Sequence, residues 1–273
     1  MRHCMVRIAI LAFVMVIFTH SCVTKLSHAN ETKTVLVAVD LSLSTKLHRN
    51  DYIRYFRMIL DSMCEGDVLL VTKIIRHPSA HDSLAFNAVR YEESSLLKNR
   101  QMVREANFKR SLDALNAFER LMSSIEDETP ILEVTKNAER LFAQFSTKRR
   151  ILVYLSDMLE CSPFSFNFEI QKPVFDLKAA QNAFQRTKSE GRIANLQGVR
   201  IYVAGARCIE PARYQAVQWF WLAYFGAAQA NLDPNRYGPD LIAFDECNSG
   251  ATCPPLFQRE VDKAGNKAGK RGS

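Results

Sequence analysis

The sequence predicts an α/β fold in which helices flank a doubly wound, mostly parallel sheet with one antiparallel edge strand. Residues 34–39 and 151–155 are runs of β-branched and aliphatic side chains bounded by charged or polar residues, a pattern typical of strands buried on both faces. Segments with helical periodicity lie between such runs, as βα units require. With 273 residues, of which 47% are hydrophobic, the chain can bury one substantial core.

The first half of the chain predicts three further elements. Residues 51–63 carry an apolar stripe at helical spacing, and Gly66 ends the helix that this stripe predicts. Residues 67–75 form another apolar run and predict the second strand. Residues 84–91 alternate between apolar and polar side chains, and we expect them to form the antiparallel edge strand.

A long amphipathic helix is predicted at residues 94–124, where apolar side chains recur at spacings of three to five among many charges. It forms an insertion next to Thr129. We expect it to pack on the sheet with a solvated outer face rather than to bind a partner. The rest of the chain predicts helices at residues 130–145, 176–188 and 211–230 and strands at residues 199–204 and 241–244.

Hard oxygen ligands follow the first buried strand. Asp40, Ser42 and Ser44 offer a carboxylate and two hydroxyls at every second residue, and they converge on a small cation if the backbone turns sharply. Oxygen ligands suit Mg²⁺, Mn²⁺ or Ca²⁺, whereas Zn²⁺ and copper prefer His and Cys. The strand at residues 151–155 is likewise followed by a carboxylate, Asp157. Because open parallel sheets bind ligands at their carboxyl edge, we expect these groups to meet there.

These residues resemble the metal-ion-dependent adhesion site of the von Willebrand factor A-type (VWA) domain, which is written Asp-x-Ser-x-Ser, a separate Thr and a separate Asp. Asp40, Ser42 and Ser44 match the first element, Thr129 matches the second and Asp157 the last. The resemblance implies Mg²⁺ (or Mn²⁺ or Ca²⁺) held by the serines and the threonine, with the aspartates acting directly or through water. It also implies that an acidic residue of a protein partner completes the coordination shell.

The resemblance covers about residues 34–245 and departs from the family pattern at two positions. Family members usually carry Gly between the two serines and Gly after the distal Asp, where this chain has Leu43 and Met158. Leu43 requires the loop to turn without the freedom that Gly has at positive φ.

Three functions are compatible with the motif. The leading hypothesis is an exported, divalent-cation-dependent protein-binding module for adhesion or scaffolding, without enzymatic turnover. The alternative is a metal-dependent phosphohydrolase of the haloacid-dehalogenase type, but that chemistry needs a second acid two residues after the first Asp, where this chain has Ser42. In the third, a metal-free scaffold, Asp40 and Ser44 merely cap the following turn and helix.

Both ends of the chain differ from its body. Residues 1–29 combine a basic start with an apolar segment that is too short for a comfortable membrane span, which indicates a signal for export. The segment is cleaved after Ala29, retained as an anchor, or modified at Cys22 as in a bacterial lipoprotein. Residues 30–250 then form the VWA-like domain, and residues 251–273 form a basic tail that we expect to be disordered. We expect the protein in the periplasm or cell envelope, attached to a membrane only through its N-terminal segment.

The formal net charge of +7 comes mostly from the two ends of the chain. The first 29 residues contribute +3 and residues 259–273 contribute a further +3, which leaves +1 for the body. A near-neutral body lacks the basic face that binding to a phosphate backbone needs, so we expect no nucleic-acid partner.

The seven cysteines contain no CxxC pair, and export favours disulfides over metal thiolates. Cys161 and Cys208 each follow a predicted strand by a few residues, so they could be bridged at the ligand-binding edge of the sheet. Cys247 and Cys253 flank a short polar segment and would close a small loop.

Overall fold

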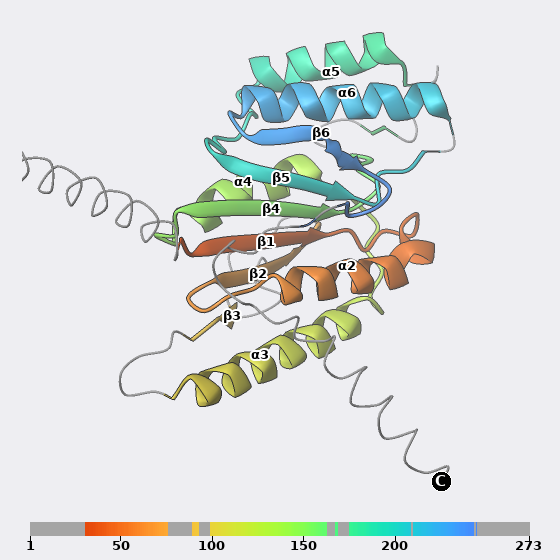
Figure 1. The fold of residues 1–273 in the computed structure, drawn as a ribbon. Coiled ribbons are helices and arrows are strands. Elements are labelled where there is room, and N and C mark those ends of the chain that lie inside the picture. Colours follow the sequence, from red (N-terminus) through yellow and green to blue (C-terminus); the bar gives the residue numbers. More distant parts are fainter. Residues whose placement is uncertain are drawn as a thin grey trace, which may run out of the picture.

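The strands are joined in one sheet. The computed structural model describes residues 31–75, 89–92, 99–162, 167–168, 175–208, 210–242 and 244. Within them the strand order is β3-β2-β1-β4-β5-β6 (Figure 1). All neighbouring pairs are parallel except β2 and β3, which confirms the doubly wound, mostly parallel sheet with one antiparallel edge strand. The strand bounds are β1 Lys33–Val39, β2 Val68–Lys73, β3 Val89–Arg90, β4 Arg149–Leu155, β5 Val199–Ala204 and β6 Asn231–Gly238.

Helices cover both faces of the sheet (Figure 1). The layer of α2 and α3 packs on the face that carries Val35 and Val37, and the layer of α4, α5 and α6 packs on the face of Leu36 and Ala38. β1 is therefore apolar along its whole length because both faces are buried. Among the described helices, none is long and apolar enough to span a membrane. The helix bounds are η1 Lys46–His48, α2 Arg49–Asp61, α3 Arg100–Leu121, α4 Ile131–Phe142, α5 Leu177–Ser189 and α6 Pro211–Ala227.

The helix predicted at residues 94–124 is α3, and it packs on α2 rather than directly on the sheet as predicted. The side chain of Asn99 caps its start by accepting a hydrogen bond from the backbone N–H of Gln101 at 2.9 Å. Phe118 stacks on Phe56 of α2 with ring centroids 4.0 Å apart, and both rings are fully buried. The apolar stripe of α3 is thus used within the domain.

The antiparallel edge strand is confirmed where the structure describes it. β3 comprises Val89–Arg90, and residues 84–88 of the predicted strand lie outside the described residues. The backbone N–H of Tyr91 donates to the carbonyl oxygen of Asp67 at 2.9 Å, which continues the contact with β2 beyond the strand.

The prediction of a last strand at residues 241–244 is wrong where the structure describes it, because residues 241, 242 and 244 lie outside any strand. The last described strand is β6 at Asn231–Gly238, parallel to β5. That segment contains Pro234 and several residues that strands disfavour. An edge strand tolerates Pro because one side of its backbone makes no ladder hydrogen bonds. Leu241 and Phe244 instead add buried side chains to the core on the side of α2 and α3.

A buried ion pair closes the amino-terminal edge of the sheet. Lys33 Nζ lies 2.8 Å from Asp67 Oδ2, and both side chains are fully buried. The Asp67 carboxylate also accepts hydrogen bonds from the backbone N–H of Lys33 at 2.9 Å and of Cys64 at 2.8 Å. One carboxylate therefore joins the start of β1 to the connection between α2 and β2.

We expect Asp67→Ala to lower the free energy of unfolding by about 3–5 kcal/mol, because it removes the carboxylate that pairs with the buried Lys33 ammonium. Urea unfolding followed by circular dichroism measures this change. The control is Glu119→Gln, which breaks the Arg57–Glu119 pair at 2.9 Å, where the side chains are 51% and 39% exposed, and should cost at most about 1 kcal/mol. Equal losses in the two variants would mean that the buried pair has no special role.

Candidate metal centre

The two strands that carry the predicted aspartates are neighbours at the centre of the sheet. Val39 of β1 lies opposite Leu155 of β4, and the backbone N–H of Asp40 donates to the Leu155 carbonyl oxygen at 2.9 Å. The helix after β1, α2, packs on one face of the sheet, whereas the helix after β4, α5, packs on α6 in the helix layer on the other side (Figure 1). Such a switch point opens the crevice in which doubly wound sheets bind ligands.

A chain of hydrogen bonds links four of the five predicted metal ligands. Asp40 Oδ1 accepts from the backbone N–H of Ser42 at 2.8 Å. The hydroxyl oxygens of Ser42 and Ser44 lie 3.0 Å apart, and the Ser44 hydroxyl donates to Asp157 Oδ2 at 2.7 Å. Two carboxylates and two hydroxyls from distant parts of the sequence are thereby brought together.

Asp40 is the buried end of this chain. Its side chain is fully buried, and its Oδ2 accepts a hydrogen bond from the Ser156 hydroxyl at 2.7 Å. Burial raises the pKa of Asp40, while hydrogen bonds from Ser42 and Ser156 and the positive charge of Arg49 act in the opposite direction. A bound cation would stabilise the carboxylate of Asp40 as an anion in this dry environment.

Two side chains that the sequence prediction missed hold the backbone of the metal loop, residues 40–45. The Thr45 hydroxyl donates to two carbonyl oxygens of this loop, at 3.0 and 3.1 Å. The guanidinium of Arg49 donates to the carbonyl oxygen of Leu41 at 3.0 Å and to that of Met122, just after α3. The start of α2 thus ties the metal loop to the end of α3.

Thr129 reaches the same edge of the sheet through its backbone. Its N–H and carbonyl oxygen each make a 3.0 Å hydrogen bond with the backbone of Cys161, and the N–H of Glu126 donates to the Leu41 carbonyl oxygen at 3.1 Å. The segment before α4 therefore lies against both the metal loop and the connection after Asp157. Among the described residues, the hydrogen-bonded chain includes the other four predicted ligands but not the Thr129 hydroxyl.

Glu160 supports the position of Thr129 and was also missed from the sequence. It is fully buried, and its Oε2 accepts from the backbone N–H of Leu132 in the first turn of α4 at 3.0 Å. Pro130 at the helix start provides no side-chain cap, so Glu160 supplies the cap from another connection. Its only signal in the sequence is an acidic residue three positions after Asp157, which does not predict a tertiary contact.

The two positions at which the resembled motif usually has Gly behave differently. Leu43 does not adopt a positive φ, so the metal loop turns without a left-handed residue there. Met158 has a φ of +64°, a conformation that costs a non-glycine residue about 1–2 kcal/mol. The Met158 side chain is fully buried in the core, and deleting a buried Met costs about 2–5 kcal/mol. Its burial therefore outweighs the backbone strain.

The donor set at this edge fits a hard divalent cation. It consists of the carboxylate oxygens of Asp40 and Asp157 and the hydroxyl oxygens of Ser42 and Ser44, which are the ligands that hard cations prefer. Tyr52 is fully buried, and its hydroxyl has no hydrogen-bond partner among the described residues. Burial raises the pKa of Tyr52, and the negative charges of Asp40 and Asp157 raise it further. A hydrated cation bound at this edge would offer a polar partner to this buried hydroxyl.

The predicted disulfide between Cys161 and Cys208 is wrong, because neither residue is disulfide-bonded. The backbone of Cys161 pairs with Thr129 before α4, and its Sγ accepts from Asn167 Nδ2 at 3.1 Å. Cys161 is thereby held against the connection that leads into α4, whereas Cys208 lies in the separate connection after β5. Three further predicted positions lie outside the described residues: Cys22, Cys247 and Cys253.

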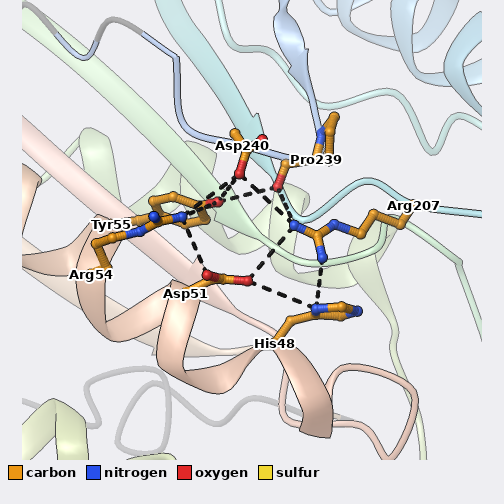
Figure 2. A network of polar contacts seen from close by, with 7 residues as sticks. All are labelled: His48, Asp51, Arg54, Tyr55, Arg207, Pro239 and Asp240. Carbon is orange, nitrogen blue, oxygen red and sulfur yellow. Dashed lines mark hydrogen bonds and ion pairs between the residues drawn. The ribbon is translucent and has the colours of Figure 1, made fainter.

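A polar network beside the metal loop joins three connections at this edge (Figure 2). Arg207, after β5, hydrogen-bonds to His48 Nδ1 at 2.8 Å and lies 3.7 Å from Asp51 and 3.9 Å from Asp240. The Tyr55 hydroxyl donates to Asp240 Oδ1 at 2.5 Å. The start of α2 is thus held to the segments that follow β5 and β6.

No protein-family model and no curated protein matches this chain, whereas solved structures do. One is proximal thread matrix protein 1 from the mussel byssus, with 13% identity and a TM-score of 0.35 over 64% of this chain and 36% of that one. Another is the pilus adhesin SpaC from Lactobacillus rhamnosus GG, with 8% identity and a TM-score of 0.42 over 87% and 30%. A third is the manganese-loaded TRAP protein of Plasmodium vivax, with 11% identity and a TM-score of 0.32 over 75% and 76%.

This chain therefore spans about a third of the length of the first two proteins. At such low TM-scores, function has to be argued from the residues of the chain itself.

Gly205, just after β5, leaves the space that Tyr52 fills. Its φ is +103°, and a Cβ there would lie 2.5 Å from the Tyr52 hydroxyl oxygen and 3.0 Å from the Ser156 carbonyl oxygen. We expect Gly205→Ala to cost more than about 2 kcal/mol of unfolding free energy, because steric overlap adds to the backbone strain of a left-handed Ala.

Urea unfolding of Gly198→Ala is the matched control for this prediction. Gly198 has a φ of +73°, and a Cβ added there would meet no atom within 4 Å. That variant should therefore lose only the free energy of backbone strain, about 1–2 kcal/mol. If the two variants lose the same stability, Tyr52 moves aside easily and is not fixed next to the site.

Proposed function

We propose that this protein is an exported VWA-type module that holds a divalent cation and binds a protein partner through it. The observation that carries the proposal is the hydrogen-bonded chain from Asp40 through Ser42 and Ser44 to Asp157, at the switch point between β1 and β4. Thr129 lies in the neighbouring connection, so all elements of the resembled motif stand at one edge of the sheet.

In this proposal Ser42, Ser44 and Thr129 bind Mg²⁺, Mn²⁺ or Ca²⁺ through their hydroxyls, and Asp40 and Asp157 hold it directly or through water. A cation of this kind supplies an exchangeable coordination position for an acidic ligand. Two aspartates balance the double charge of the ion. The repulsion that a partner carboxylate meets here is therefore weaker than it would be at a site with more acidic side chains.

The position of Asp40 argues for binding without turnover. Its carboxylate is fully buried, and both oxygens accept hydrogen bonds, from the backbone N–H of Ser42 and from the hydroxyl of Ser156. An aspartate nucleophile would have to present a carboxylate oxygen to its substrate and would need a second acid nearby for proton transfer. Ser42 occupies the place of that acid, so we favour a binding module over a phosphohydrolase.

Exposed apolar side chains in the metal loop and in η1 just after it support a protein partner. Leu43 is 67% exposed between the two serines, and Leu47 is 89% exposed a few residues later. Lys46 beside them is also exposed. Apolar contacts next to a cation fit a protein segment in which an acidic side chain is flanked by apolar ones.

We place the protein in the periplasm or cell envelope. The support is the export signal predicted at residues 1–29, with Cys22 as the candidate site of lipid attachment. Both features lie outside the described residues.

Millimolar Mg²⁺ or Mn²⁺ should raise the melting temperature of the mature domain, because a ligand that binds only the folded state stabilises it, by about 2.7 kcal/mol at a concentration of 100 Kd. Asp40→Asn should abolish this shift. In chelator, however, the variant should melt near the wild-type temperature, because the removal of a buried carboxylate charge offsets the loss of one of its two hydrogen-bond acceptors. Differential scanning calorimetry with and without cation measures both effects.

The control for this experiment is Asp240→Asn, an aspartate at the same edge that is 54% exposed and outside the proposed ligand set. It should keep the full cation-dependent shift. A wild-type protein that shows no shift and binds no cation by titration calorimetry would support the metal-free scaffold instead.

Partner capture from the native cell envelope should require both the cation and the exposed leucines. We expect chelator to abolish capture, and the double variant Leu43→Ser, Leu47→Ser to reduce it by about tenfold or more, since burying one leucine side chain against a partner is worth about 1 kcal/mol or more. Quantitative pull-down with the purified domain measures this. Met58→Ser, at a 38% exposed position within α2, should capture normally. Capture that persists in chelator would contradict a cation-mediated interaction.

A further inference from the structure

The backbone next to Asp157 is strained and has to be held in place. Met158 directly follows this aspartate and has a φ of +64°. A residue in the left-handed region keeps that conformation only when its surroundings hold it there. The question is therefore which groups hold Met158, because they also decide where Asp157 points.

Hydrogen bonds hold the Met158 backbone from both sides. Its N–H donates to the Ser156 hydroxyl oxygen at 3.0 Å, and that hydroxyl in turn donates to Asp40 Oδ2 at 2.7 Å. Its carbonyl oxygen accepts from Nε1 of Trp221, in the middle of α6, at 2.9 Å. The first hydrogen bond comes from the site itself, whereas the second comes from the helix layer beneath it.

Trp221 is firmly fixed by its neighbours. Its side chain is fully buried in the core on the side of α4, α5 and α6. Its ring lies 5.7 Å from the Phe225 ring and 5.0 Å from the Phe220 ring, measured between centroids. A rigid aromatic with one N–H donor is suited to fixing a single carbonyl group.

We infer that Trp221 is a positioning residue for the cation, and this inference rests on the proposed function. Its N–H fixes the Met158 carbonyl and thereby keeps the Asp157 carboxylate in its place. Asp157 Oδ1 accepts from the backbone N–H of Leu159 at 3.0 Å, and its Oδ2 accepts from the Ser44 hydroxyl at 2.7 Å. Without the Trp221 hydrogen bond, the strained residue can relax to negative φ, which turns the preceding peptide and draws the carboxylate away from Ser44.

The test variant is Trp221→Phe, which keeps an aromatic ring and removes the N–H donor. We expect its Kd for Mg²⁺ or Mn²⁺, measured by titration calorimetry well below the melting temperature, to rise by about tenfold, as for other residues that orient metal ligands. The matched control is Tyr224→Phe on the same helix. It removes a hydroxyl that donates to the Arg192 carbonyl oxygen and accepts from the Ala194 N–H, far from this loop in sequence. It should lower the melting temperature but leave the Kd unchanged.

A double-mutant cycle separates positioning from a general loss of packing. Met158→Gly removes the strain, because Gly adopts a φ of +64° without steric cost. In that background, Trp221→Phe should change the Kd by less than about twofold, although it still removes packing from the core. An undiminished tenfold effect in the glycine background would contradict the proposed route through Met158.

Amide hydrogen exchange of Leu159 tests the inference without any cation. This N–H is bonded to Asp157 Oδ1, so its protection reports on the aspartate directly. In chelator, Trp221→Phe should reduce the protection of Leu159 and Tyr224→Phe should not. If Met158→Gly does not fold, this exchange measurement still tests whether Trp221 positions Asp157.

The outcomes distinguish this inference from the proposed function. A wild-type protein that binds no cation overturns the proposed function, and the Leu159 exchange then decides the positioning of Asp157 alone. A wild-type protein that binds the cation, together with normal Leu159 protection and a normal Kd in Trp221→Phe, shows that Trp221 has only a packing role.

Discussion

The parallel pairing of β1 with β4 is the constraint on which the candidate site depends, because it brings the residues after both strands to one edge. A hydrophobic pattern specifies strand register only where one face is buried and the other is not, and β1 is buried on both. Polar contacts at its two ends distinguish the registers instead. Lys33 pairs with Asp67 at one end, and at the other Asp40 bonds to Ser156 and to the Leu155 carbonyl oxygen. The contacts that fix the fold thus also place the first predicted ligand.

The connections around the site are held mostly by buried polar side chains rather than by apolar packing. Arg49 ties the metal loop to the end of α3, Glu160 caps α4, and Trp221 bonds to the connection after β4. Each of these groups is largely or fully buried and has a specific partner, so its connection has little freedom to move. A site fixed in this way would lose little conformational entropy when it binds a cation, which favours affinity.

The metal loop divides its residues between three environments. Asp40 and Ser42 are buried at the switch point, Leu41 is buried in the core against α2, and Leu43 is exposed. Leu41 anchors the loop, so the neighbouring oxygens keep their positions while the outer leucine remains free to contact another molecule. An adhesive function needs this combination, because the cation site requires rigidity and the partner requires accessible apolar surface.

The central strands could be predicted from the sequence, because a strand buried on both faces is apolar throughout. The oxygen-bearing side chains that we propose as ligands directly follow two of these strands, and their role as ligands stays a prediction. The same reasoning failed for β6, whose Pro234 and polar residues are tolerated only because it lies at the sheet edge. It also missed Glu160 and Trp221, since their partners lie on other elements, and it paired Cys161 with the wrong neighbour. Local patterns predict the secondary-structure elements. Edge positions, tertiary caps and the strained Met158 depend instead on contacts between residues distant in the chain, which only the folded structure decides.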